Sequence, residues 1–178
     1  MTGTSTTTNI DYFKEKEEDI LNIIFPITNI ELDYSTTYQR WDAVHHNKQM
    51  VIEIKVRGFN YDFFYSVYNG TFLIEQDKYF ALLKRAKELN YRPCYVFAYT
   101  DYKKGKVGWE DCKINGWSMI DLSQIDEKDL IKTKRLCPKN SINPNSKKIP
   151  KDVFLIEQKS LNTYNHKERI LNNGRCFH

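Results

Sequence analysis

The stretch RWDAVHHNKQMVIEIKVR, residues 40–57, decides the fold. It predicts two short antiparallel strands joined by a tight turn at positions 47 and 48. In this register Asp42 stands directly across from Glu53, and Lys55 returns to the same face two residues later, because strand side chains alternate. Two carboxylates and an ammonium are therefore expected to converge, with directly opposed side chains about 5 Å apart.

The alternation of apolar and polar residues supports this pairing. Met50, Ile52 and Ile54 point to one face, and Glu53 and Lys55 point to the other. A slip of one residue would bury the charges and expose the isoleucines, so the register is strongly specified. The alternative is an exposed amphipathic hairpin with ordinary surface charges, since an acid followed by Glu-x-Lys is a common pattern.

Helices and strands are predicted to alternate around the hairpin. Residues 10–25 and 76–90 carry apolar side chains at helical spacing. The expected buried stripe of the second helix comprises Phe80, Leu83, Ala86 and either Leu82 or Leu89. Residues 93–100 form a near-continuous apolar run, typical of a strand buried on both faces. This order predicts an α/β fold, in which a mixed central β-sheet is flanked by helices.

The segments between and after these elements complete the expected layout. Residues 58–74 are rich in aromatic side chains and predict a loop or irregular hairpin, whose rings either fill the core or stack on bases. Further expectations are a connection or edge strand at 27–34, peripheral strands at 107–109 and 117–122, a strand near 152–158 and a helix around 163–172 followed by a frayed tail.

Length and composition favour one domain. The chain has 178 residues, of which 40% are hydrophobic and 14% aromatic, enough to bury a core. We expect a disordered leader at 1–8, a single domain at 9–158 and a C-terminal extension at 159–178. No apolar stretch is long enough to span a bilayer, and no signal-peptide pattern opens the chain, so no membrane partner and a cytoplasmic location are expected.

Positive charge gathers in residues 126–151. The net charge of the chain is +4, which permits nucleic-acid binding without requiring it. This segment holds eight basic residues and three prolines, and predicts a basic, irregular loop that contacts phosphates. The alternative is a loop that is charged only because it is solvated.

Cysteine and histidine offer no metal site. The four cysteines are widely spaced and lack the spacing of zinc ligands, so reduced thiols are expected. His45 and His46 are neighbours on a strand and point to opposite faces, so they cannot chelate one ion together. His45 is expected to pack near Met50, and His46 to lie at the tip of the hairpin.

Asp42, followed by Glu53-Ile54-Lys55 on the next strand and then by a helix and a strand, resembles the core of the PD-(D/E)XK nuclease superfamily over about residues 10–122. The likeness is greatest to small stand-alone members of phages and of restriction or recombination systems. The residue before the first acid is Trp41, where the signature has proline. The resemblance implies a restriction-endonuclease-like core and an intracellular, phage-encoded type of enzyme.

The resemblance also implies the chemistry. It makes Asp42, Glu53 and the Ile54 carbonyl ligands of Mg²⁺, with Mn²⁺ as a substitute, and Lys55 the catalytic lysine of a DNA endonuclease. Lys55 would position water or stabilise the transition state, since two carboxylates oppose the lowered pKa that a base requires. The alternative is an inactive protein of the same fold that acts in DNA binding or assembly. A homodimer is a further expectation, because nucleases that cut both strands often dimerise.

Two further residues are candidates for the site. Glu17 falls inside the apolar stripe of the first helix, where an acid is costly unless it is paired or bound to a cation. In the resembling nucleases a glutamate of this helix often points at the metal. Glu17 can instead be a boundary residue, with Glu18 in that role. Lys78, in the first turn of the second helix, either reaches back to the site or lies on the surface.

Overall fold

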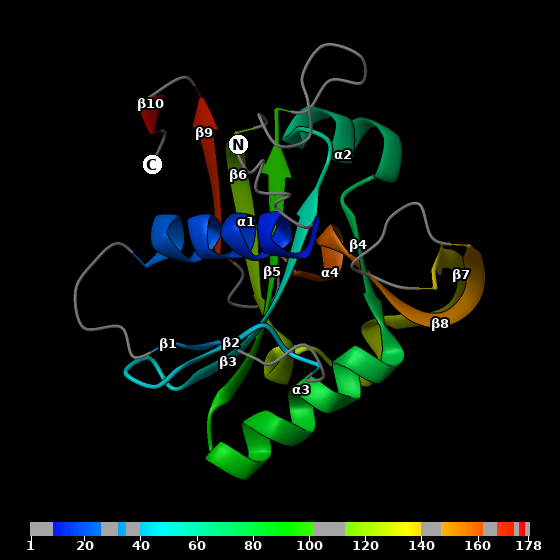
Figure 1. Ribbon diagram of the computed structural model, residues 1–178. Helices are drawn as coiled ribbons and strands as arrows, with labels where there is room; N and C mark the ends of the chain where they lie inside the picture. Colours follow the sequence, from blue (N-terminus) through cyan, green and yellow to red (C-terminus); the bar gives the residue numbers. More distant parts are fainter. Residues whose placement is uncertain are drawn as a thin grey trace, which may run out of the picture.

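The computed structural model describes residues 9–25, 32–34, 40–101, 113–139, 147–161, 167–172 and 175–176. Its strands form a seven-stranded sheet of order β1-β2-β3-β5-β6-β9-β10 and a three-stranded sheet of order β4-β8-β7 (Figure 1). The strands of the larger sheet are β1 (Leu32–Tyr34), β2 (Ala43–His45), β3 (Met50–Arg57), β5 (Arg92–Thr100), β6 (Ile114–Asp121), β9 (Lys167–Asn172) and β10 (Arg175–Cys176). The smaller sheet comprises β4 (Thr71–Glu75), β7 (Leu130–Pro138) and β8 (Lys148–Glu157).

Helices accompany both sheets. The α-helices are α1 (Asn9–Ile24), α2 (Tyr61–Tyr68), α3 (Gln76–Leu89) and α4 (Gln158–Leu161), and two 3-10 turns are η1 (Leu122–Gln124) and η2 (Glu127–Asp129). Strands β3 and β5 run parallel, and the other pairs of the larger sheet are antiparallel. The expectation of an α/β fold with a mixed sheet and flanking helices is confirmed. Among the described helices, none is long and apolar enough to cross a membrane.

The predicted hairpin register is confirmed over the three pairs of β2 with β3. Ala43 pairs with Ile52, Val44 with Val51 and His45 with Met50. The turn lies at positions 46–49, where the Gln49 N–H donates to the His46 carbonyl over 3.0 Å. The ladder therefore holds Glu53 and Lys55 in fixed places on β3.

Strand β3 is buried on both faces. On one face Met50, Ile52 and Ile54 belong to a cluster that includes Ile20 and Leu21 of α1. On the other face Val51 belongs to the larger core. The exposed amphipathic hairpin is therefore wrong, because both faces of the strand are covered. Glu53 is consequently a charged group in the interior, only 1% exposed.

The helix at 76–90 and the strand at 93–100 are confirmed as α3 and β5. The buried stripe of α3 is Tyr79, Leu82 and Ala86, whereas Phe80 is 52% exposed, so the predicted stripe was wrong in part. The Tyr79 ring meets Phe154 of β8 at 4.9 Å between centroids. The Phe80 ring also meets Phe154, at 5.7 Å between centroids, but remains half-exposed.

Residues 58–74 are not a loop or hairpin. They hold α2, capped by the Asn60 side chain, which accepts from the Phe63 N–H over 2.9 Å, and then strand β4. Asn69 and Gly70 both have positive φ and end the helix rather than closing a hairpin. Phe64 is the buried ring of this helix and packs against Phe72 and Phe97, while Phe63 and Tyr68 are 44% and 48% exposed. The sequence signal for a turn was correct, and the elements that it joins were not.

The expectations for the second half of the chain need correction. Residues 126–151 are not an irregular loop, because β7 and β8 pair over nine positions within and beyond this segment. Strand β6 is interior to the sheet order rather than peripheral. The helix expected around 163–172 is wrong, since β9 pairs there with β6. The expected edge strand is present as β1, and the strand near 152–158 is part of β8. The segments 1–8 and 107–109, for which a leader and a strand are predicted, lie outside the described residues.

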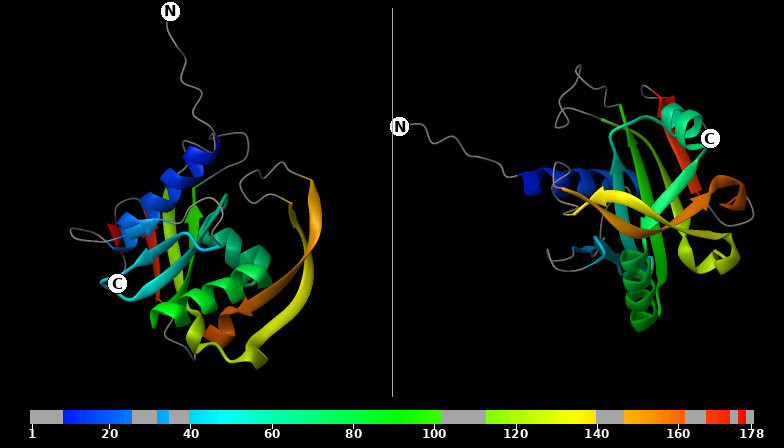
Figure 2. Two further views of the ribbon diagram at one scale, coloured as in Figure 1. Left: turned by 60° about the horizontal axis from the view of Figure 1, so that its bottom comes forward. Right: turned by 90° about the vertical axis from the view of Figure 1, so that its right-hand side faces the viewer.

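Two strands of the smaller sheet, β7 and β8, form a long curved pair beside α3 (Figure 2). Strand β4 pairs with β8 from Thr71 opposite Glu157 to Glu75 opposite Val153. Glu75 is followed at once by α3. The start of α3 and the end of β4 are thereby fixed next to β3, where the predicted site residues lie.

Candidate active site

Asp42 sits where the β2–β3 ladder ends. Its backbone N–H donates to the Ile52 carbonyl over 2.9 Å, and its Oδ2 accepts from the Ile54 N–H over 2.6 Å. The predicted direct pairing of Asp42 with Glu53 is therefore wrong, because the backbone of Asp42 shifts to Ile52 and its carboxylate caps the open ladder. The carboxylate still lies close enough to Glu53 to raise its pKa.

The main chain at Ile54 adds an oxygen to this end of the ladder. In a paired strand the N–H and C=O of one residue point to the same neighbouring strand. Since the Ile54 N–H faces Asp42, the Ile54 carbonyl faces the same side, beyond the last pair of β2 at Ala43. This places the carbonyl oxygen on the side of the Asp42 carboxylate, as the predicted ligand set requires.

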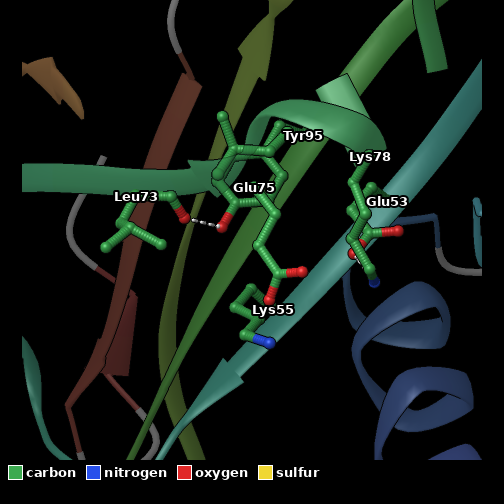
Figure 3. Close-up of a pocket in the computed structure, with 7 residues that line it drawn as sticks. Glu53, Lys55, Leu73, Glu75, Lys78 and Tyr95 are labelled. Atoms are coloured by element: carbon green, nitrogen blue, oxygen red, sulfur yellow. Dashed lines mark hydrogen bonds and ion pairs between the residues drawn. The ribbon is translucent and has the colours of Figure 1, made fainter. Parts of the chain in front are cut away.

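Glu53 is the buried centre of the cluster. Its Oε1 accepts a hydrogen bond from the ammonium of Lys78 in α3, with which it forms an ion pair (Figure 3). Its Oε2 is buried and has no hydrogen-bond partner within the described part of the chain. Burial, followed by the charge of Asp42, raises the pKa of Glu53 to about 8, against the opposing effect of Lys78. An unpartnered buried oxygen of this kind is costly unless a cation or proton satisfies it.

Lys78 reaches back to the site and does not lie on the surface, which decides between the two alternatives that the sequence left open for it. Its side chain is 21% exposed. Burial alone would lower the pKa of Lys78, but the charges of Glu53 and Asp42 outweigh it and raise the pKa. Lys78 therefore stays charged at any physiological pH and holds one edge of the Glu53 carboxylate.

Glu17, and not Glu18, belongs to the cluster. Glu18 is exposed, whereas burial together with the charges of Asp42 and Glu53 raises the pKa of Glu17 to about 9. Lys78 and Lys55 also act on Glu17, in the opposite direction. The structure thus brings Glu17, Asp42, Glu53 and Lys78 within electrostatic reach of one another, and Lys55 within reach of Glu17, Glu53 and Lys78.

The surroundings of Lys55 disfavour its positive charge. Burial first, and then the charges of Arg57 and Lys78, lower its pKa to about 8, although Glu53 and Glu75 oppose this. The expectation that two carboxylates would keep its pKa high is therefore wrong, because the cost of burying the charge exceeds their attraction. Near pH 8 a large fraction of Lys55 is neutral and able to accept a proton.

Glu75 is a site residue that the sequence did not reveal. It ends β4, and in Figure 3 its carboxylate extends toward Lys55. It also accepts from Lys151 of β8 over 2.9 Å, in a pair whose side chains are 13% and 18% exposed. The sequence signal was only an acid before a helix, since the β4–β8 pairing that brings Lys151 there is remote in the chain.

A small cavity lies between the charged side chains of β3, the end of β4 and the start of α3. Its free volume is about 20 Å³, and the lining residues are Glu53, Lys55, Leu73, Ile74, Glu75, Lys78 and Tyr95. The Tyr95 hydroxyl donates to the Leu73 carbonyl over 2.8 Å and fixes one wall. Such a volume holds one particle of the size of water, so it suits an ion or a water molecule rather than an organic cofactor.

The oxygen atoms of this site would suit a hard divalent cation that takes few of its ligands from the protein. Among the described side chains, no group of three or more His, Cys, Asp or Glu residues is arranged to hold a metal ion. Mg²⁺ is usually bound through one or two carboxylates and keeps several waters. Asp42, the unpartnered oxygen of Glu53 and the Ile54 carbonyl meet that need, with Glu17 close by.

The histidines lie apart from this cluster. His45 is buried beside Phe25, with ring centroids 4.9 Å apart, and pairs with Met50 across the hairpin. His46 lies at the tip, with its Nδ1 3.2 Å from the Tyr91 hydroxyl. Both expectations for them are confirmed, and Cys94 and Cys137 are free thiols.

The raised carboxylate pKa values predict a pH dependence of stability without metal. The ordinary pKa of a glutamate side chain is about 4.5, and in the folded protein the pKa values of Glu17 and Glu53 are about 9 and about 8. The folded protein therefore binds more protons than the unfolded chain, and the free energy of unfolding falls as pH rises from about 5 to about 8, by about 1.4 kcal/mol per pH unit for each proton. Urea unfolding in EDTA across this range measures the slope.

The double variant Glu17→Gln/Glu53→Gln is the control for this slope. This variant retains His45, whose pKa is lowered by burial. His45 therefore makes the free energy of unfolding rise with pH in the lower part of the range. Lys55 contributes a rise only above pH 8, where its folded form loses its proton first. In the double variant, the free energy of unfolding is expected not to fall as the pH rises. Equal slopes in the two proteins would contradict the assignment.

No protein-family model, no curated protein and no solved structure matches this chain. The function must therefore be inferred from the arrangement of its residues.

Proposed function

We propose that this chain is a metal-dependent DNA endonuclease of the PD-(D/E)XK type, which hydrolyses phosphodiester bonds with Mg²⁺ or Mn²⁺. The observation that supports it most is the buried, unpartnered Oε2 of Glu53 beside Asp42 and two lysines. Lys78 satisfies only one oxygen of this fully buried carboxylate, which leaves the other for a cation or a proton. Perturbed titratable groups that cluster around a small cavity are typical of catalytic sites.

In this proposal Asp42, Glu53 and the Ile54 carbonyl hold the cation, and Glu17 stands beside them. A divalent ion supplies an activated water and neutralises charge on the phosphate. Glu17, with a pKa of about 9, is protonated at neutral pH in the absence of metal and would release that proton to solvent when a cation binds beside it.

The two lysines divide the remaining work. Lys78 remains charged and orients the Glu53 carboxylate through Oε1, which leaves Oε2 for the metal. Lys55, with a pKa of about 8, either accepts a proton from the attacking water or stabilises the charge on the phosphate. Glu75 acts on Lys55 and is itself held by Lys151, so it is a positioning residue for the catalytic lysine.

One observation favours a second candidate, an inactive protein of this fold that binds DNA or acts in assembly. The ammonium of Lys78 already compensates one oxygen of Glu53, as it would if a salt bridge had replaced the metal. In that case the cluster would only stabilise the fold. The presence of Asp42, Glu53 and Lys55 together supports the enzyme instead.

A supercoiled plasmid incubated with the purified chain separates the two candidates. We expect nicking or linearisation with Mg²⁺ or Mn²⁺ and none in EDTA, because the proposed ligands are all oxygen donors that need a hard cation. The Glu53→Gln protein is the matched control for contaminating nuclease. Intact plasmid with both metals, or equal cleavage by Glu53→Gln, would refute the proposed enzyme.

A further inference from the structure

Strands β7 and β8 continue as a two-stranded ribbon beyond the three-stranded sheet. The pairing of β4 with β8 ends at Glu75 and Val153. The pairing of β7 with β8 goes on from Lys134 opposite Asp152 to Pro138 opposite Lys148. Lys139 and Lys147 are joined by one more backbone hydrogen bond of 2.9 Å. We call residues 134–139 and 147–152 the distal ribbon; Figure 2 shows it curving past α3.

The distal ribbon concentrates the positive charge of the chain. It holds one acid, Asp152, and six basic residues: Lys134, Arg135, Lys139, Lys147, Lys148 and Lys151. Its net charge of +5 exceeds the +4 of all 178 residues, so the rest of the chain is slightly negative. A charge separated in this way gives one surface of the molecule an affinity for polyanions.

Most of these cations are turned to solvent. Arg135, Lys139, Lys147 and Lys148 are exposed. Lys134 lies 3.7 Å from Asp152 in a pair whose side chains are 72% and 62% exposed, an arrangement that water screens. Lys151 alone is drawn inward, to Glu75 at the cavity. The ribbon therefore begins at the candidate active site and carries its exposed charge away from it.

We propose that the distal ribbon binds double-stranded DNA by lying in the major groove. A ribbon of two strands about 4.8 Å apart, with five paired residues at about 3.4 Å each, is roughly 17 Å long. The major groove of B-form DNA is about 12 Å wide and admits such a ribbon. Leu136, which is 67% exposed between the charges, supplies an apolar side chain of the kind that contacts the thymine methyl group there.

The composition of the ribbon separates duplex DNA from other nucleic acids. Proteins bind single strands by stacking bases on aromatic rings, and the twelve residues of the distal ribbon include no Phe, Tyr, Trp or His. Double-stranded RNA has a deep and narrow major groove that side chains do not enter. Duplex DNA is the polyanion whose shape and charge both match.

This inference deepens the proposed function and rests on it only for the consequence of binding. Lys151 and Glu75 join the ribbon to the cavity, so a duplex held by the ribbon lies next to Glu53 and Lys55. Lysines and prolines on unpaired strands also prevent edge-to-edge aggregation. If that were their whole role, removing the charge would change solubility and leave DNA affinity unaltered.

Binding in EDTA tests the ribbon without any cleavage. The probe is a labelled 20-base-pair DNA duplex, measured by fluorescence anisotropy with the full chain over a salt series. The variant Arg135→Ala/Lys147→Ala/Lys148→Ala is compared with Lys48→Ala/Lys84→Ala/Lys87→Ala, which removes the same charge from exposed positions elsewhere. We expect the ribbon variant to bind at least about tenfold more weakly, with a salt slope lower by about 2.7, and the control to change by less than about twofold.

Further probes test the groove on the wild-type protein, so they do not depend on how a variant folds. We expect a duplex with bulky C5 substituents on its pyrimidines, which fill the major groove, to bind at least about tenfold more weakly. The matching single strand and the RNA duplex should bind more weakly as well. Equal affinities of the two triple variants, or full affinity for the blocked duplex, would refute the proposal that the distal ribbon binds in the major groove. Binding of RNA, single strands or anionic vesicles as tightly as duplex DNA would refute it as well.

The binding result and the plasmid result are independent. Ribbon-dependent binding with an uncut plasmid would overturn the nuclease and leave the ribbon standing. Cleavage that is the same in both triple variants, with equal affinities, would overturn the ribbon and leave the nuclease standing.

Discussion

Replacing Lys55 with alanine is expected to slow Mg²⁺-dependent plasmid nicking by a factor on the order of 10²–10³, the cost of removing one preorganised group that acts in the transition state. Lys55 is half-buried beside Glu53 and acts on this proposed metal ligand through charge. The variant should therefore retain its affinity for metal and DNA. Initial nicking rates at saturating Mg²⁺ measure the effect, and Lys87→Ala, at an exposed position of α3, is the matched control.

Arginine at the same position decides between the two roles of Lys55. Arginine keeps the positive charge and cannot give up its proton in a protein. If Lys55 accepts a proton, Lys55→Arg should be as inactive as Lys55→Ala, and the wild-type rate should rise with pH up to about 8, the pKa of Lys55. If it stabilises charge, Lys55→Arg should recover part of the rate. Wild-type rates in Lys55→Ala would contradict any catalytic role.

Metal is expected to stabilise the folded chain through Asp42 and Glu53. At about a hundredfold excess of Mn²⁺ over its Kd, binding adds about 2.7 kcal/mol to the free energy of unfolding. For a domain of this size that raises Tm by roughly 5–11 °C. Asp42→Asn and Glu53→Gln should lose the increase, because each retains its hydrogen-bond acceptor for Ile54 or Lys78 and loses the charge that attracts the cation.

Thermal melts with and without Mn²⁺ measure this shift. Glu88→Gln, on the exposed end of α3, controls for a general effect of removing one acid. Lys55→Ala should show at least the full shift, since its ammonium repels the cation. The same Tm increase in Glu53→Gln as in the wild type would place the metal elsewhere and contradict the ligand assignment.

The features set by local periodicity could be predicted from the sequence. The alternation in β3 and the tight turn fixed the hairpin register, and helical spacing located α1 and α3. Continuous apolar residues located β5, which is buried along its length. That Asp42 and Lys55 both lie near Glu53 was expected from the alternation, whereas the shift of the Asp42 backbone to Ile52 was not.

Features that depend on distant pairing could not be predicted. Strand β7 has few apolar residues in alternation and is a strand because it pairs with β8 over nine positions. Strand β9 pairs with β6 although its sequence also suits a helix. In α2 the asparagines at both ends are capping residues that resemble turn residues in a sequence. Glu75 and Lys151 were missed for the same reason, since only the β4–β8 ladder brings them together.

The position of β4 at the edge of the smaller sheet has a consequence for synthesis. Its ladder partner in the described sheets is β8, which leaves the ribosome long after β3 and α3. A nascent chain that ends before Val153 already contains Glu53 and Lys55, but it lacks the strand that anchors Glu75. For the proposed nuclease, we expect chains that end before Val153 to be inactive, because Glu75 then lacks the strand partner that holds it beside Lys55.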